Sequence, residues 1–366
     1  MPAADRDAGP GPSLLHALAV RGRFTGSEAL AEARRLCAEQ LRLLGFAVTE
    51  HQFEYSTVPA RFGMPAVGTA SVVLLGGVVL VAQRTGAAPA SVLAAVSLAA
   101  IAGLARWLTG ASAIALPAAR AAGVNLQAVR GVEPRVWLVA HLDSKSQRYP
   151  LALRAVGASL TIGAWVAMLL LIMLAGAGHG WPHAWWVWGA GAAGGALLGL
   201  GSAGNDSPGA VDNASGVAAV LAASARLAPD VPVGVLITDA EEVGLAGAHA
   251  WARHRTPGTA VNCDTIDDRG AFLLLTSGRR PRRVAAAAVR AAGHTGIAVR
   301  ARPLPRGVLT DGVALARAGW ACATLSRATA RTLLRIHTRR DSVGHLEGSG
   351  IAPAAVLLES LVKELC

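Results

Sequence analysis

Hydrophobic and charged positions are distributed very unevenly along this chain. Residues 62–105 contain one charged side chain, Arg84, and residues 155–205 contain no Asp, Glu, Lys or Arg. Because a helix needs about 20 apolar residues to cross the hydrocarbon core of a bilayer, each stretch is long enough for two crossings. The pattern therefore predicts four transmembrane helices, arranged as two helical hairpins.

The tips of the two hairpins can also be located. The first lies near residues 83–89. The second falls at "GAGHGWPHAW", which divides the apolar stretch into spans near 155–176 and 182–203. Tryptophans are enriched where helices meet the membrane–water interface. Four of them lie in or just after this motif and predict an interfacial cluster: Trp181, Trp185, Trp186 and Trp188.

The rest of the chain has the pattern of a water-soluble α/β domain. Residues 27–44 place apolar side chains at helical spacing, and "GFAVTEHQFEY" alternates like a strand. "VNLQAVRG" and "PRVWLVAHLDS" predict two further strands. Helix and strand patterns then alternate from Asp206 to Cys366, ending in a helix over 354–365. We expect one domain in three segments, 12–61, 121–150 and 205–366, interrupted by membrane hairpins at 62–110 and 151–204.

Charge flanking the spans predicts the topology. Each hairpin returns the chain to its starting side, so all soluble segments share one face of the membrane. Basic residues flank the spans on that face: Arg61, Arg106, Lys145, Arg148 and Arg154. The tips offer only Arg84, and the positive-inside rule then places the soluble domain in the cytoplasm. The alternative is that the apolar stretches are buried helices of a large soluble protein, although four such runs are difficult to bury in a domain of this size.

Composition supports a multi-pass membrane protein. Hydrophobic residues make up 53% of the chain, charged residues 16%, and mean hydropathy is +0.43. The net charge of +11 comes almost entirely from arginine, which suits contact with anionic lipid headgroups. No basic motif is interleaved with aromatic residues, so we expect no nucleic-acid partner. The four cysteines form no CxxC pair, and the N-terminus lacks the pattern of a cleaved signal; both features favour reduced thiols on the cytoplasmic side.

Metal-ligand residue types recur at the ends of the predicted strands. They occur in "VAHLDS" (His141, Asp143), "AVDNASG" (Asp212), "DAEEVGLAGA" (Glu241, Glu242), "VNCDTID" (Asp264) and "IHTRRDSV" (His337). Each stretch alone has an ordinary structural explanation, such as an N-cap or a surface histidine. Because sites form at the carboxyl ends of strands in an open α/β sheet, the set predicts a shared centre. Mixed nitrogen and oxygen ligands of this number suit two divalent cations, zinc above all.

In this order the motifs resemble the co-catalytic di-zinc aminopeptidase family, peptidase clan MH, whose relatives include glutaminyl cyclase and the transferrin-receptor ectodomain. The resemblance implies a zinc-aminopeptidase-like three-layer sandwich around a central mixed sheet. It also implies two Zn²⁺ per chain, with Asp212 bridging them. His141 and Asp264 would complete one metal, and Glu242 and His337 the other.

The resemblance further implies the catalytic roles. Glu241 would act as general base on the metal-bridging water, and Asp143 would orient the neighbouring ligand His141. Three departures are visible. His141 and Asp212 are 212 − 141 = 71 positions apart because the second hairpin separates them, which places the site near the membrane. Ile336 stands where several family members have a tyrosine, and Gly312 replaces a histidine.

The sequence thus predicts a membrane-anchored di-zinc metallopeptidase that acts on peptides, most simply an aminopeptidase. Two alternatives stay open: a single-zinc acyltransferase similar to glutaminyl cyclase, and a non-catalytic binding module with a peptidase fold. A transporter with a peptidase-like regulator is disfavoured because the spans contain no Asp, Glu, Lys or Arg other than Arg84 at a tip. The expected partners are a peptide substrate and the lipid bilayer. The pattern does not determine substrate specificity or oligomeric state.

Overall fold

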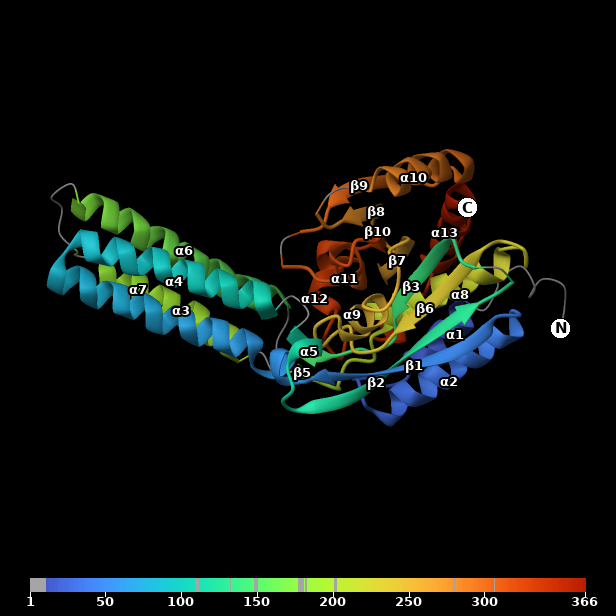
Figure 1. The fold of residues 1–366 in the computed structure, drawn as a ribbon, viewed down its shortest axis with the longest axis horizontal. Coiled ribbons are helices and arrows are strands. Elements are labelled where there is room, and N and C mark those ends of the chain that lie inside the picture. Colours follow the sequence, from blue (N-terminus) through green and yellow to red (C-terminus); the bar gives the residue numbers. More distant parts are fainter. Residues whose placement is uncertain are drawn as a thin grey trace.

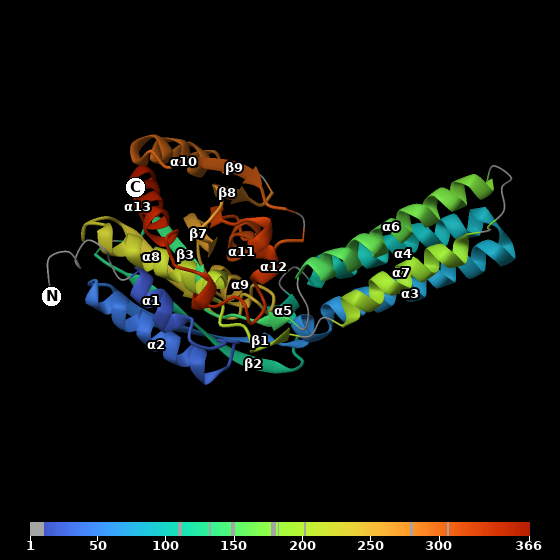
Figure 2. The ribbon, with the colours of Figure 1, turned by 180° about the vertical axis from the view of Figure 1, so that it is seen from behind.

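A computed structural model describes residues 11–108, 112–131, 133–147, 151–176, 181, 183–200, 203–278, 281–305 and 307–366. A bundle of long helices extends from one side of an α/β domain (Figure 1). The N-terminal helices of the α/β domain and its C-terminus lie on the side away from the bundle (Figure 2).

An eight-stranded mixed sheet is the centre of the α/β domain, in the order β1-β2-β6-β3-β7-β10-β8-β9. The strands are β1 (Ala47–Ser56), β2 (Arg120–Val129), β3 (Val136–His141), β6 (Val233–Thr238), β7 (Thr259–Ile266), β8 (Phe272–Thr276), β9 (Val299–Pro303) and β10 (Ala321–Arg327). Strands β6, β3, β7 and β10 are mutually parallel, whereas β2 joins β6 antiparallel. The carboxyl ends of the four parallel strands therefore share one edge of the sheet, as the strand-end motifs predicted.

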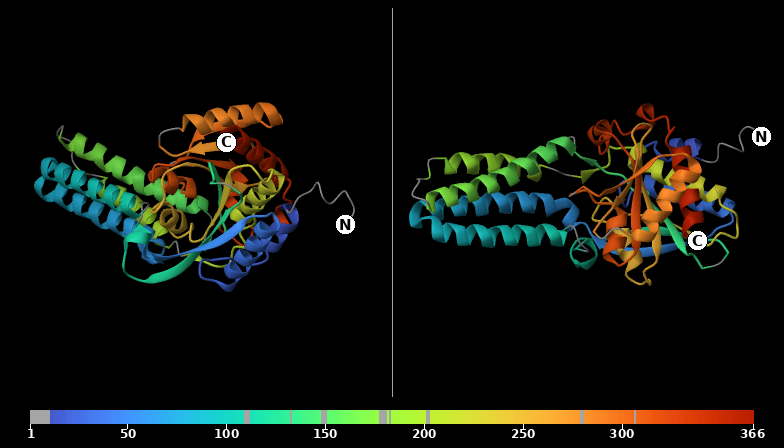
Figure 3. Two further views of the ribbon diagram at one scale, coloured as in Figure 1. Left: turned by 45° about the vertical axis from the view of Figure 1, so that its right-hand side comes forward. Right: turned by 90° about the horizontal axis from the view of Figure 1, so that it is seen from above.

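Helices cover both faces of the sheet and make three layers (Figure 3). One face packs against α1 (Gly11–Leu18), α2 (Glu28–Leu43), α8 (Ser215–Arg226), α10 (Arg282–Thr295) and α13 (Ile351–Leu365). The other packs against α9 (Ala246–Ala252) and α11 (Asp311–Arg317). Alternation along β3 explains the division: Leu138 faces the first layer, while Trp137 and Val139 face the second.

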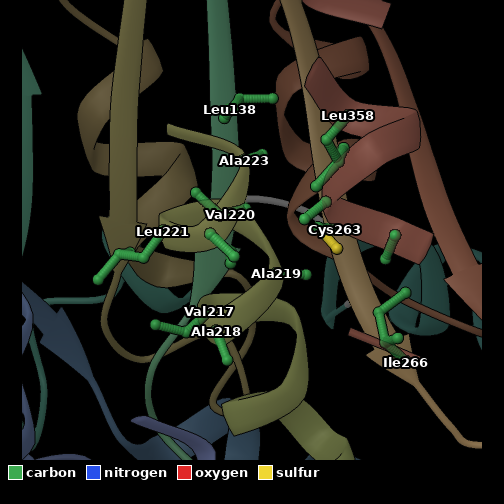
Figure 4. Close-up of a cluster of buried hydrophobic side chains, with 14 of the residues drawn as sticks. Leu138, Val217, Ala218, Ala219, Val220, Leu221, Ala223, Cys263, Ile266 and Leu358 are labelled. Carbon is green, nitrogen blue, oxygen red and sulfur yellow. The ribbon is translucent and has the colours of Figure 1, made fainter. Parts of the chain in front are cut away.

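The main core lies between α8, α13 and the sheet. Helix α8 is buried around most of its circumference, and its side chains meet Leu138, Cys263 and Leu358 (Figure 4). Small residues on α8 let it lie close to the sheet; a Cβ at Gly216, for example, would lie 2.6 Å from the Cys263 carbonyl oxygen. This helix begins at Ser215, three residues after Asp212, so the packed core fixes the position of that residue.

The helical bundle consists of α3 (Val58–Thr85), α4 (Ala87–Leu108), α6 (Leu151–Gly176) and α7 (Ala184–Gly199). Helix α7 packs against both α6 and α3 through adjacent glycines. A Cβ at Gly194 would lie 2.7 Å from the Gly157 carbonyl oxygen, and one at Gly195 would lie 2.8 Å from that of Gly68. Small residues at such crossings permit the close backbone approach typical of membrane helices.

Within the described residues, three helices are long and apolar enough to cross a membrane: α3, α4 and residues 153–176 of α6. The prediction of four spans is therefore met only in part. The fourth, α7, has 16 residues, which at 1.5 Å per residue is about 24 Å, shorter than a hydrocarbon core of about 30 Å. The predicted span 182–203 extended further at both ends, and positions 182, 201 and 202 lie outside the described residues.

Most predicted elements are present with shifted ends. The predicted helix 27–44 is α2, which begins after its N-cap Ser27. The first hairpin begins at Val58 rather than residue 62, because Pro59 is favourable in a first helical turn. Strands β9 and β10 and the short helix α12 (Ala330–Arg335) had no counterpart in the predicted elements.

Candidate metal centre

The seven predicted site residues lie together at the carboxyl edge of the sheet. His141 is the last residue of β3, Glu241 and Glu242 follow β6, and Asp264 lies near the end of β7. Asp212 precedes α8, and His337 follows α12. Strands β3 and β7 pair only as far as Val139 and Asn262, so the two strands separate before His141 and Asp264 are reached. The site occupies the space that this separation opens.

Two compact groups of donor atoms result. His141, Glu241 and Asp264 form one, and Asp212, Glu242 and His337 form the other; within each group the donor atoms lie within 4.8 Å of one another. All six side chains are mostly buried.

Asp212 connects the groups through its two carboxylate oxygens. Its Oδ1 is 3.2 Å from His141 Nε2, and its Oδ2 is 3.0 Å from His337 Nε2. Although burial opposes ionisation, the contacts with these two imidazoles hold the pKa of Asp212 well below its ordinary value. An ionised carboxylate thus lies between two imidazoles, one on each oxygen.

Two buried polar side chains, Asp341 and Asn213, hold the backbone of this site in place. Asp341 accepts hydrogen bonds from the Val211 amide at 2.7 Å and from the Asp212 amide at 3.2 Å. Asn213 donates to the Cys263 carbonyl at 2.9 Å and accepts from the Thr265 amide at 3.1 Å. Asn213 thereby satisfies backbone groups of β7 beyond the point where pairing with β3 ends.

Asp143 contacts both His141 and the two glutamates. His141 Nδ1 is 3.0 Å from the Asp143 carbonyl oxygen and 3.6 Å from its carboxylate. The carboxylate also accepts the backbone amides of Glu241 at 3.1 Å and Glu242 at 3.0 Å, contacts that the sequence did not predict. Asp143 therefore fixes the position of both glutamates, and its main chain contacts the histidine.

Lys145, to which the sequence analysis gave no role at the site, contacts the second group directly. Its Nζ lies 2.6 Å from Glu242 Oε2, whereas Glu242 Oε1 faces His337 Nε2 at 3.0 Å. Burial opposes ionisation of Glu242, but the positive charges of His337 and Lys145 lower its pKa to about 2. Glu242 Oε1 is buried without a hydrogen-bond partner in the described structure. A buried carboxylate oxygen that accepts no hydrogen bond, together with the imidazole nitrogen beside it, makes a suitable pair of ligands for a metal ion.

Glu241 differs electrostatically from its neighbour. Burial raises the pKa of Glu241 well above its ordinary value, and the charge of His141 only partly opposes this. Two adjacent glutamates thus have opposite pKa shifts, because Glu242 has cationic partners on both oxygens and Glu241 does not. Such a separation of pKa values is typical of sites in which one group binds and the other transfers protons.

Arg23 is the other important residue that the sequence pattern did not reveal. Its guanidinium is fully buried and donates to the carbonyls of Leu142 at 2.9 Å, Leu18 at 2.7 Å and Gly209 at 3.0 Å, and also to Pro208. Leu142 lies just before the second hairpin, and Gly209 lies just after it. One side chain therefore joins the two ends of the inserted segment beside the site. An isolated arginine in a loop carries no sequence signal for this role.

Both hairpins touch the site at their bases. Gln147 lies in the short strand β4 (Ser146–Gln147) before α6, and its backbone N–H donates a hydrogen bond to the His337 carbonyl oxygen at 2.8 Å. Ala113 in α5 (Ser112–Ala115), which follows the first hairpin, packs against Ala240 and Val243 on either side of the two glutamates. The site therefore lies near the bases of the two hairpins, and its position near a membrane stays a prediction.

The two residue-level departures from the family pattern also have defined surroundings. Ile336 is buried in the main core. Gly312 lies in α11, where a Cβ would come 2.5 Å from Thr324 Oγ1, so a larger residue has no space there. Asp311, its neighbour, is fully buried, accepts a hydrogen bond from Thr238, and has a pKa that burial raises to about 7.

Comparison with known proteins agrees with this geometry. Residues 192–361 match the sequence model of peptidase family M28. No curated protein matches the chain in a sequence search.

Solved structures share the fold. A zinc aminopeptidase from Bacillus subtilis aligns with a TM-score of 0.54 at 15% identity, covering 96% of this chain and 93% of its own. The Fimbriiglobus ruber glutaminyl cyclase aligns with a TM-score of 0.56 at 14% identity, and the alignment covers 100% of this chain and 96% of the cyclase. An aminopeptidase from Aneurinibacillus sp. strain AM-1 aligns with a TM-score of 0.55 at 14% identity, and the alignment covers 96% of this chain and 92% of that aminopeptidase.

The fold and the donor groups define a protein with the zinc-peptidase fold, built on a mixed eight-stranded sheet like that of zinc aminopeptidases. Residues 192–361 match peptidase family M28, and the resemblance inferred from the motifs is confirmed.

Proposed function

We propose that the chain is a membrane-anchored di-zinc metallopeptidase, and that it acts as an aminopeptidase. The observation that carries the proposal is the position of Asp212, whose two oxygens contact His141 and His337 on opposite sides. A carboxylate shared in this way is suited to bridge two cations. The donor set, two imidazoles and several carboxylates, is one that zinc accepts.

In this proposal His141, Asp212 and Asp264 hold one zinc, while Asp212, Glu242 and His337 hold the other. When bound, two zinc ions would polarise a scissile carbonyl and acidify an attacking water. Glu241 would accept a proton from the attacking water and return it to the departing amine; the raised pKa of its carboxyl group suits both roles. Asp143 keeps Glu241 aligned through the backbone, and Lys145 turns one oxygen of Glu242 toward His337.

The membrane arrangement is part of the same proposal. The four bundle helices serve as four spans, with α7 shorter than its partners, and the three peptidase segments 12–61, 121–150 and 205–366 lie together on the cytoplasmic side. Support comes from the apolar helices and from basic residues such as Arg61, Arg106 and Arg154 at the domain end of the bundle. A reporter fused after Cys366 that behaves as extracytoplasmic would refute the orientation.

The deciding experiment combines metal analysis with one isosteric substitution. Purified wild-type protein should contain about two zinc ions per chain and cleave peptides with a free N-terminus but not N-blocked ones. Glu241→Gln should keep both zinc ions and lower kcat by roughly 10²–10⁴. Full activity in Glu241→Gln would remove this residue from the role of base. Glu28→Gln, a change on α2 distant from the site, is the matched control.

A second candidate is a single-zinc acyltransferase, because glutaminyl cyclases share the fold as closely as the aminopeptidases do. One zinc per chain, together with cyclisation of N-terminal glutamine and no peptide cleavage, would favour it. Neither activity, with metal still bound, would instead favour a binding module.

A further inference from the structure

The segment that carries His337 has an unusual outer surface. Residues 328–340 contain four arginines and no acidic residue. Within them, α12 presents Leu333 and Leu334 outward, 47% and 52% exposed. We call residues 328–340 the α12 segment. Helices that lie at a membrane interface typically combine large apolar side chains with flanking arginines or lysines.

The α12 segment is held rigidly by its other face. Thr332 donates to Asp267 and also closes the capping box at the start of α12. Arg335 donates to the same carboxylate at 3.0 Å, and Ile336 is buried in the core. The outward position of Leu333 and Leu334 is therefore fixed by the fold, since the inward positions are occupied by residues with defined partners.

The bundle shows what this surface faces. Helix α12 contacts α6, and it lies beside the end of α6 that is nearer the α/β domain in both Figure 1 and Figure 2. At this end α6 also exposes apolar residues, Leu153 and Val156. If the bundle spans a bilayer, the outer surface of the α12 segment meets the headgroup layer where α6 enters it.

Charge complements this position. Arg331, Arg339 and Arg340 are exposed on the segment. Arg339 pairs with Asp206 at 3.3 Å. An excess of guanidinium groups beside exposed leucines matches phosphate groups above acyl chains.

We propose that the α12 segment docks on anionic phospholipid headgroups, with Leu333 and Leu334 entering the interface and the arginines contacting lipid phosphates. The proposal rests on the membrane anchoring proposed above. It places the His337 loop, which Gln147 also ties to the base of α6, against the bilayer surface. A substrate would then reach the metal centre beside the headgroup layer.

The test uses the full chain in vesicles. A fluorophore is attached to Leu334→Cys in a Cys366→Ser background, because the other three cysteines are buried. The vesicles contain phosphatidylcholine with or without phosphatidylglycerol, plus a lipid that carries a nitroxide near its headgroup. We expect quenching of the fluorophore, stronger by roughly twofold or more with phosphatidylglycerol. Leu43→Cys, 73% exposed on α2 away from the bundle, is the matched control and should not be quenched.

Replacing Arg331, Arg339 and Arg340 with glutamine should remove the dependence on phosphatidylglycerol, and added inorganic phosphate should not reproduce the effect of the lipid. Equal quenching at positions 334 and 43 would overturn the proposal, as would an effect of free phosphate equal to that of phosphatidylglycerol. Resistance to alkaline extraction reports separately on the membrane spans, and peptide cleavage reports on the enzyme, so failure of docking is distinguishable from failure of either.

Discussion

Replacing Arg23 by methionine tests how the second hairpin is joined to the metal centre. The substitution keeps most of the side-chain volume and removes every donor. Four carbonyl oxygens then lose their partner: those of Leu18, Leu142, Pro208 and Gly209. Because Arg23 is 1% exposed, water cannot readily replace the guanidinium.

The size of the effect follows from these bonds. An unsatisfied buried polar group costs about 1–3 kcal/mol. Taking the low end for four carbonyls gives about 4 kcal/mol, a large part of a typical stability of about 5–15 kcal/mol. For a domain of this size, 1 kcal/mol shifts the melting temperature by about 2–4 °C, so Arg23→Met should melt roughly 8–16 °C lower. Gly209 lies three residues before Asp212, so zinc content should fall as well.

Thermal melting in detergent, followed by a near-ultraviolet signal, measures this change. Arg23→Lys keeps the charge and some donors and should lie between wild type and Arg23→Met. Arg35→Met, at an exposed position on α2, is the control and should melt as wild type does. A melting temperature for Arg23→Met within about 2 °C of wild type would show that the carbonyls find other partners and that the reasoning is wrong.

Three further substitutions probe other parts of the molecule. Lys145→Met should destabilise metal-free protein more than zinc-loaded protein, because zinc gives Glu242 a second positive partner; equal melting shifts before and after chelation would contradict this. Gly194→Leu should force α6 and α7 apart at a cost of about 1–3 kcal/mol, whereas Gly189→Leu, where a Cβ meets open space, should melt as wild type does. Burial and Arg317 lower the pKa of His249 to about 4, so its contribution to stability is complete above pH 6.5 and is lost as pH falls toward 4. His249→Gln should therefore reduce the fall in melting temperature between pH 7 and pH 5, by the equivalent of about 2 kcal/mol, and an unchanged fall would refute the assignment.

The sequence was most informative where the signal is local. The uncharged stretches predicted long helices because apolar length is what a bilayer requires, and α3, α4 and α6 are such helices. The strand-end motifs predicted a shared site because parallel strands place their carboxyl ends at one edge. His141 Nε2 and Asp212 Oδ1 lie 3.2 Å apart at that edge, although the two residues are 71 positions apart in the sequence.

The sequence was least informative where a role depends on what folds against a residue. Lys145 appeared only as a basic residue flanking a span, yet its ammonium contacts Glu242. Asp143 was predicted only to orient His141; its carboxylate also accepts backbone amides from the loop that follows β6. Both contacts join segments about a hundred positions apart, and no local pattern records such pairs.

By itself, then, the sequence determined the apolar helices, the alternating strands and the chemical types available to bind metal, because each depends on residues near one another in the chain. Only the tertiary structure decided which oxygen of Asp212 faces which histidine, and which glutamate has a cationic partner. It also decided that the segment bearing His337 lies beside α6. These depend on how β3 and β7 separate and on how Arg23 closes the ends of the second hairpin, and packing between distant segments sets both.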